Sequence, residues 1–253
     1  MSDVIIVGGG AAGCLASIYS ARMGKSVTVF EKNEKLGRKL RITGKGRCNV
    51  TNNSSQEVHL SNIPVNSRFL YSAYSAFGAE DTMNFFEELG VSLKTERGNR
   101  VFPISDSANE VADALGSEMK RLGVKLIKKR VTELLIEDGN CVGVKVGERE
   151  YHANSVLIAC GGKSYPVTGS NGDGYMLAEA VGHTITKLKP SLVPLVSSDK
   201  FCAEMMGLSL RNVVLNLYDG KKKVYSELGE MLFTHFGVSG PLVLSASSHM
   251  KDV

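Results

Sequence analysis

The chain has 253 residues, of which 43% are hydrophobic and 22% are charged, as expected for a globular protein with a sizeable core. Its apolar runs are far shorter than the roughly 18 residues that a membrane helix requires, so we expect no membrane partner. The five cysteines are scattered and form no CxxC pair, so we expect neither a metal site nor disulfides, and the reducing cytoplasm is the simplest location.

The net charge of +4 is unevenly distributed along the chain. Residues 32–47 contain seven Lys or Arg and one acid, Glu34, so this segment carries +6 and the rest of the chain about −2. A local cationic loop on a mildly acidic body favours a small anionic ligand over a nucleic-acid backbone. We therefore expect a small-molecule partner and no nucleic acid.

The first thirty residues have the pattern of a strand–helix–strand unit. Residues 3–7 form a continuous apolar strand, residues 14–24 a helix of small residues, and residues 26–31 a second strand. This order predicts a βαβ unit with parallel strands. Because the first strand begins at Asp3, we expect no signal peptide.

A glycine-rich turn joins the first strand to its helix. Gly8, Gly10 and Gly13 form the motif G-x-G-x-x-G, and Ala12 lies in the same turn. The first glycine permits a tight turn, the second lets a pyrophosphate approach the backbone, and the third lets the helix pack closely on the strand. Glu31, at the end of the second strand, can accept hydrogen bonds from a ribose and disfavours a 2′-phosphate. The pattern predicts FAD or NAD binding, and the alternative is a turn with structural duties only.

The cationic segment follows this acid directly. From Leu36 onward its cations are interspersed with glycines and are Arg38, Lys39, Arg41, Lys45 and Arg47. The glycine spacing does not match a Walker loop and no aromatic residue is present for base stacking, so the simplest interpretation is a loop around the anionic cofactor. Cys48 has two interpretations: neighbouring cations lower a thiol pKa and favour a redox role, whereas a small buried residue requires no special function.

The rest of the chain predicts further helices and strands. The helices are expected at residues 79–90, 107–123 and 172–182, and the strands at 124–129, 131–138, 141–146 and 155–162. Ser107 and Glu110 have the spacing of a capping box. Asp173 either caps the last of these helices or contacts the cofactor. A compositional break at Pro190 predicts two domains: residues 1–190, an α/β Rossmann-type domain with a parallel sheet and a β-meander, and residues 191–253, which are mostly β.

Several segments resemble the BaiN-like, or aminoacetone-oxidase-like, family of FAD-dependent oxidoreductases. They are the stretch from "VIIVGGGAAG" to "GKGRCNVTN", then "GNRVFPISDSANEVADAL", "RVTELL", "CGGKSYPVTGSNGDGYMLAEAVGH" and "GEMLFTHFGVSGPLVLSAS". The resemblance covers nearly the whole chain. It implies FAD in a glutathione-reductase-type Rossmann fold, with a second domain inserted after Pro190.

The resemblance also implies which residues meet FAD. The AMP half is assigned to Gly8, Gly10, Gly13, Glu31 and Lys32, the pyrophosphate and flavin to Arg47 and Asn49, adenine to the backbone of Val131, and close approach to Gly161 and Gly162. Ala12, Arg38, Cys48 and Asp173 complete the set of cofactor-binding candidates. Members of this family continue beyond the equivalent of residue 253 with a segment beside the flavin. We therefore expect an intact AMP half and an incomplete flavin half in these residues.

The predicted function is an FAD-dependent oxidoreductase that transfers hydride between a small organic substrate and flavin. NAD(P)H is the candidate reductant, and it would dock on the flavin directly because no second G-x-G-x-x-G is present. Flavin performs the redox chemistry itself, so no catalytic residue is assigned. The alternatives are a non-catalytic dinucleotide-binding fragment, an NAD-dependent dehydrogenase and an RNA-associated flavoprotein.

Overall fold

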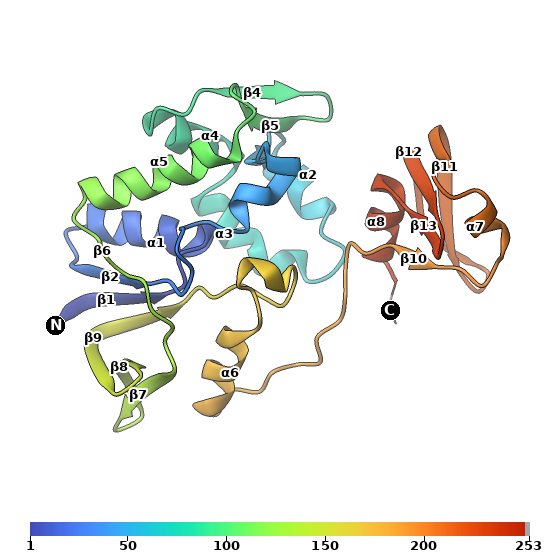
Figure 1. Cartoon of the computed structure of the whole chain (residues 1–253). Coiled ribbons are helices and arrows are strands. Elements are labelled where there is room, and N and C mark those ends of the chain that lie inside the picture. Colours follow the sequence, from blue (N-terminus) through green and yellow to red (C-terminus); the bar gives the residue numbers. More distant parts are fainter. Residues whose placement is uncertain (251–253) are drawn as a thin grey trace. The chain divides into compact units, whose positions relative to one another are not determined.

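The computed structural model describes residues 1–250, which fold into two compact units (Figure 1). The first unit comprises residues 1–60 and 68–185, and the second comprises residues 61–67 and the chain from Thr186 onward. Within residues 1–250, no helix is both long enough and apolar enough to cross a membrane. Whether the residues after 190 form an inserted domain stays a prediction.

Residues 1–185 contain nine strands, six α-helices and three short 3-10 turns. The strands are β1 (Ser2–Val7), β2 (Val27–Phe30), β3 (Thr51–Asn52), β4 (Leu93–Glu96), β5 (Arg100–Pro103), β6 (Lys125–Ile127), β7 (Glu133–Glu137), β8 (Asn140–Val146) and β9 (Arg149–Ile158). The helices are α1 (Ala11–Arg22), α2 (Gln56–Ser61), α3 (Tyr71–Ala76), α4 (Ala79–Glu88), α5 (Ala108–Arg121) and α6 (Asp173–Ala180). The 3-10 turns are η1 (Leu40–Gly46), η2 (Ser67–Leu70) and η3 (Pro166–Thr168).

The main sheet has six strands in the order β6-β2-β1-β9-β8-β7. Strands β6, β2, β1 and β9 are parallel to one another, whereas β7, β8 and β9 form an antiparallel meander. The predicted βαβ unit, parallel sheet and β-meander are therefore present. In this register Val7, the last residue of β1, lies between Phe30 and Ile158, the last residues of β2 and β9. The carboxyl ends of these three strands therefore meet at one edge of the sheet.

Both faces of β2 and of the second half of β1 are buried, as their continuous apolar sequence predicts. Successive residues of a strand point to opposite faces, so Ile6 packs with Ile18 of α1 and Leu115 of α5. Its neighbour Ile5 packs on the other face with Val144 of β8 and with Leu177 of α6. Figure 1 shows α1 and α5 side by side against the sheet. The strand is thereby held from both sides, which fixes the turn that follows it.

Two local expectations differ from the structure. Neither half of the capping box forms: Ser107 makes no side-chain cap, and the carboxylate of Glu110 accepts a hydrogen bond from Ser105. No helix was predicted between residues 32 and 78, where the structure has α2 and α3. Each of these helices has six residues, which is too short for an amphipathic repeat to be visible in the sequence.

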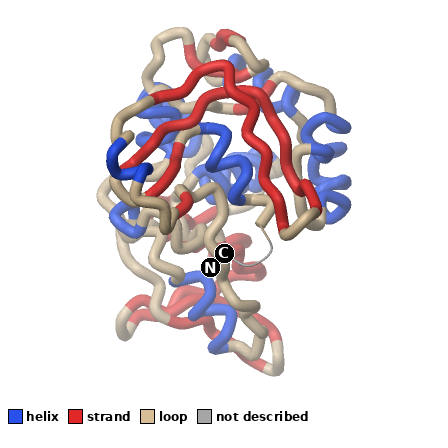
Figure 2. Tube along the Cα trace, turned by 90° about the vertical axis from the view of Figure 1, so that its right-hand side faces the viewer, coloured by secondary structure: helices blue, strands red, loops and turns tan. Residues whose placement is uncertain are grey.

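The second unit is built on a four-stranded sheet in the order β10-β13-β12-β11. Its elements are β10 (Leu195–Val196), α7 (Phe201–Glu204), β11 (Ser209–Asp219), β12 (Lys222–Thr234), β13 (Gly237–Ser239) and α8 (Pro241–Ser247). Figure 2 shows β11 and β12 as two long strands that run side by side. Their hairpin turns at Gly220 and Lys221, between the paired residues Asp219 and Lys222.

Candidate cofactor site

The three motif glycines are required for different reasons. Gly8 has φ +113°, and a Cβ atom there would lie 2.5 Å from the carbonyl oxygen of Ala159. A Cβ atom on Gly13 would lie only 1.8 Å from the carbonyl oxygen of Gly8, so the first turn of α1 packs directly on the loop. A Cβ atom on Gly10 would meet nothing within 4 Å. Gly8 and Gly13 are thus demanded by packing, whereas Gly10 faces open space.

The N-terminus of α1 offers unpaired backbone donors to this space. Among residues 1–250, the N–H groups of Gly10, Ala11 and Ala12 have no acceptor, and α1 has no side-chain cap. A helix N-terminus also carries about half a positive charge. Three free amides and this charge together form a binding site for an anion.

Glu31 lies beside the turn at the end of β2. Its side chain is nearly buried, and Oε2 accepts a hydrogen bond of 2.8 Å from the Gly9 N–H. Oε1 accepts hydrogen bonds of 2.7 Å from the backbone N–H and from the side-chain amide of Asn33. Arg38 donates in turn to the Asn33 oxygen at 3.2 Å. The carboxylate is therefore held at the cavity wall by fixed donors.

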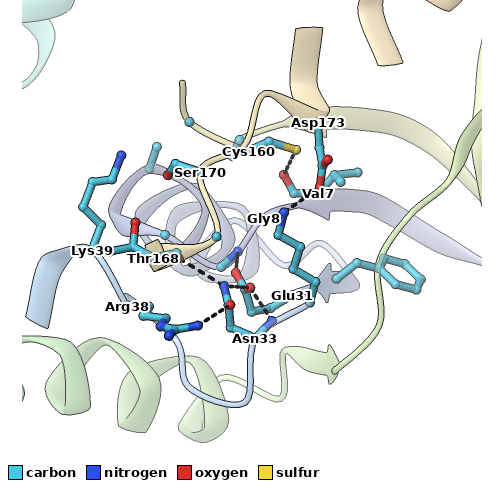
Figure 3. Close-up of a pocket in the computed structure, with 18 of the residues that line it drawn as sticks. Val7, Gly8, Glu31, Asn33, Arg38, Lys39, Cys160, Thr168, Ser170 and Asp173 are labelled. Atoms are coloured by element: carbon cyan, nitrogen blue, oxygen red, sulfur yellow. Dashed lines mark hydrogen bonds and ion pairs between the residues drawn. The ribbon is translucent and has the colours of Figure 1, made fainter. Parts of the chain in front are cut away.

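A cavity of about 590 Å³ extends along these groups (Figure 3). Its walls are the glycine turn, the ends of β2 and β9, the cationic loop and the segment before α6. The charged side chains in the wall are Glu31, Lys32, Arg38, Lys39, Lys129, Arg130 and Asp173. Five cations against two acids give the cavity a net positive charge, which suits an anionic ligand of the size of a nucleotide.

Asp173, the first residue of α6, connects three parts of the wall. It is 7% exposed, and its carboxylate accepts hydrogen bonds of 2.7 Å from Lys32 and from Arg130. Burial raises the pKa of Asp173, but the hydrogen bonds from these two cations outweigh it, and the pKa lies below its ordinary value. The predicted helix cap is not formed, because the carboxylate faces the cations.

Val131 lies at the same end of the cavity as Asp173. Its side chain is buried, and neither its N–H nor its C=O has a hydrogen-bond partner among residues 1–250. A free donor and acceptor on one residue match the edge of an adenine ring. Gly161 also lines the cavity, with φ +70°, whereas Gly162 lies outside the lining.

Arg47, Cys48 and Asn49 do not line the cavity. Arg47 donates to the carboxylates of Asp106 and Glu96, and its guanidinium lies 4.1 Å from the centre of the Phe102 ring. With its amide oxygen and nitrogen interchanged, the Asn49 side chain donates to the carbonyls of Thr51 and Val101, which satisfies both amide groups. A role of these three residues toward the cofactor stays a prediction.

The suggestion that cations lower the Cys48 pKa is wrong. The thiol is fully buried, and burial raises its pKa. Arg47 is directed toward the two acids and therefore does not stabilise a thiolate. The structure supports the simpler interpretation, a small buried residue.

Several wall residues were not predicted. Asn33, Lys129, Arg130 and Ser170 carry polar groups at the cavity, and none belongs to the glycine motif. Arg130 could have been predicted from the sequence, because it directly precedes the candidate Val131 in "RVTELL". Asn33 had none, because its role depends on the position of Glu31 in space.

Known proteins resemble this chain in sequence and in fold. The family described as "HI0933-like protein Rossmann domain" matches residues 2–248. A 3-dehydro-bile acid delta(4,6)-reductase from Clostridium scindens is 34% identical over 99% of the chain and 61% of that protein. A ribosomal RNA dihydrouridine synthase from Haemophilus influenzae is 32% identical over 99% of the chain and 62% of that protein. The chain thus spans about three fifths of the length of these curated relatives.

Among solved structures, a flavocytochrome c3 fumarate reductase in its open conformation is similar with a TM-score of 0.60. It is 20% identical, and the match covers 83% of this chain and 47% of that one. At this identity the likeness concerns the fold alone. Together with the family match, it confirms the predicted α/β fold of Rossmann type.

Proposed function

Because the chain belongs to the HI0933-like Rossmann family, as the sequence resemblance predicted, we propose that it is the FAD-binding part of an FAD-dependent oxidoreductase. One observation carries the proposal: unpaired amides at the start of α1 lie beside the Glu31 carboxylate in a cavity with cationic walls. This arrangement offers a diphosphate its donors and a ribose its acceptor.

The residues of the cavity fit the parts of FAD. The amides of Gly10 to Ala12 face the diphosphate, with Arg38 and Lys39 supplying positive charge nearby. Glu31 keeps the Gly9 N–H and would accept ribose hydroxyls on its remaining lone pairs, and the free N–H and C=O of Val131 would meet adenine. When bound, FAD supplies the ability to accept and donate a hydride. The chain's own residues bind and orient it, and none of them is assigned to proton transfer.

We propose the reduction of an activated carbon–carbon double bond as the reaction. The names of both relatives, a delta(4,6)-reductase and a dihydrouridine synthase, denote the saturation of such a bond. NAD(P)H is proposed as the reductant, and a small organic molecule as the substrate. The name of the second relative keeps an RNA substrate as the second candidate. A cytoplasmic location is also proposed, because all five cysteines are free thiols.

The visible spectrum of the purified chain, reconstituted with FAD, tests the proposal. We expect a flavin spectrum that bleaches on addition of NADH or NADPH under anaerobic conditions. Glu31→Gln should weaken FAD binding about tenfold, because a hydrogen bond to a charged acceptor is lost. The matched control is Glu34→Gln, whose side chain is 89% exposed and lies outside the cavity lining. A chain that binds no FAD, or equal losses in both variants, would refute the proposal.

A further inference from the structure

We propose that Tyr165 contacts a second nucleotide, distinct from the dinucleotide of the glycine turn, at the end of the cavity marked by Lys39. The inference rests on the proposed function and names a contact for its reductant. Tyr165 belongs to the segment that joins β9 to α6. Tyr165 itself is outside the cavity lining, but its carbonyl is bonded to Thr168 and its neighbour Ser164 is bonded to Lys39, and both partners line the cavity. Tyr165 therefore lies beside the rim of the cavity.

The backbone of Tyr165 adopts a conformation that bulky residues rarely take. Its φ is 50° and its ψ is 65°, in the left-handed region. Most other non-glycine residues with positive φ in residues 1–250 are Asn or Asp, which tolerate this region. A tyrosine in this conformation persists only where its surroundings impose it, and such positions gather at ligand sites.

The surroundings of Tyr165 impose the conformation from both sides. Thr168 donates twice to the Tyr165 carbonyl, from its N–H at 2.9 Å and from its hydroxyl at 2.7 Å. On the other side, the Ser164 hydroxyl accepts a hydrogen bond of 3.0 Å from the Lys39 ammonium. Pro166 fixes the backbone that follows. The backbone that carries the ring is therefore held in place.

The result of this strain is an exposed aromatic ring. Tyr165 is 66% exposed, its ring contacts no other aromatic or cationic group among residues 1–250, and its hydroxyl has no hydrogen-bond partner there. Packing therefore gives no reason for a tyrosine here, and a glycine would adopt this backbone without strain. A contact with a ligand does give a reason.

The neighbouring charges indicate the chemical class of this ligand. The Lys39 ammonium is bonded to the residue before Tyr165, and Lys163 in the same segment has no acidic partner among residues 1–250. A flat ring beside ammonium groups fits a base that carries a phosphate. Figure 3 shows Lys39 and Asp173 on opposite sides of the cavity, so this contact lies away from the end assigned to adenine. The ligand is a nucleotide, supplied either by NAD(P)H or by RNA.

Three variants test the inference: Tyr165→Ala, which removes the ring, Tyr165→Phe, which keeps it, and the control Tyr218→Ala. Tyr218 is 57% exposed on β11 of the second unit. In the FAD-loaded chain, Tyr165→Ala should raise the NADH or NADPH concentration for half-maximal flavin reduction about tenfold, because stacking is lost. Tyr165→Phe and Tyr218→Ala should match the parent chain. Reduction by dithionite, which has no ring, should be the same in all variants.

A second experiment distinguishes the two sources of the nucleotide: the binding of a single-stranded RNA oligonucleotide to the same variants is measured by gel shift. Weaker RNA binding in Tyr165→Ala, with unchanged NAD(P)H kinetics, identifies RNA as the source. Unchanged behaviour of Tyr165→Ala toward both ligands overturns the inference but leaves the proposed function intact. If the parent chain binds no FAD, the proposed function fails. An NADH fluorescence titration of the flavin-free chain then decides the inference, and equal affinities of Tyr165→Ala and the parent overturn it.

Discussion

Substituting the glycines of the turn by alanine separates packing from ligand binding. In Gly13→Ala the new Cβ lies 1.8 Å from the Gly8 oxygen, where real contacts stay beyond 3.0 Å, so α1 and the loop must part by about 1.2 Å. Overpacking of this kind costs about 1–3 kcal/mol, and the better helix propensity of alanine returns up to about 1 kcal/mol. We expect a net loss of about 2 kcal/mol, which lowers Tm by about 4–8 °C.

Gly10→Ala should behave in the opposite way. Its Cβ meets no atom within 4 Å, so the cost is the weaker N-cap alone, below about 1 kcal/mol. The methyl group projects into the space assigned to the diphosphate, and FAD affinity should fall at least tenfold. Tm is measured by differential scanning fluorimetry without FAD, and affinity by calorimetric titration with FAD.

Gly116→Ala in α5 is the matched control. Its Cβ would lie 3.6 Å from Leu36, an ordinary contact, so the variant should be as stable as the parent or more so, with unchanged FAD affinity. If Gly10→Ala binds FAD as tightly as the parent, the diphosphate does not lie on this turn. If Gly13→Ala is as stable as Gly116→Ala, then in solution α1 does not pack on the Gly8 carbonyl as closely as the structure shows.

Two further predictions concern ion pairs away from the cavity. Hydrogen bonds from Arg121, with help from Arg22 and against the effect of burial, lower the pKa of Glu118 from 4.5 to about 2. A carboxylate with a lowered pKa stabilises the fold fully above about pH 4.5, and this stabilisation is lost as the pH falls toward 2. By urea denaturation, Glu118→Gln should be less stable than the parent by roughly 2 kcal/mol at pH 7, and the difference should vanish near pH 2. Equal gaps at both pH values would contradict this. Arg47→Ala should lower Tm because the hydrogen bonds from Arg47 to Glu96 and Asp106 are lost. Arg47→Lys should not restore Tm, because an ammonium cannot bridge both acids and also stack on Phe102. A lysine variant as stable as the parent would rule out this geometry.

The strand–helix–strand unit could be predicted because its signals are local. The apolar run before Gly8, the glycine spacing and the acid at residue 31 all lie within one short stretch. The close approach of Gly13 to Gly8 and the hydrogen bond from Gly9 to Glu31 are contacts inside that stretch. Short-range patterns suffice where the physical cause is also short in range.

The cations of the loop could not be sorted in this way, because their partners are distant in sequence. Arg47 pairs with Glu96 and Asp106, which lie 49 and 59 residues later, and Arg41 pairs with Asp113, 72 residues later. In the sequence these two arginines look the same as Arg38, which reaches the cavity wall. Only the packing of α5 and of the β4–β5 hairpin against the loop distinguishes them.

Asp173 shows that such distant pairing also shapes the electrostatics of the cavity. Its carboxylate holds Lys32 and Arg130, which lie 141 and 43 residues away, and offsets part of their charge. Among residues 1–250, Arg38 and Lys39 are bonded only to neutral groups, so their charge remains available. A diphosphate is therefore drawn more strongly toward the side of Arg38 and Lys39 than toward the side of Asp173. That bias favours one orientation of a dinucleotide, with its uncharged adenine at Val131 and its phosphates at the start of α1.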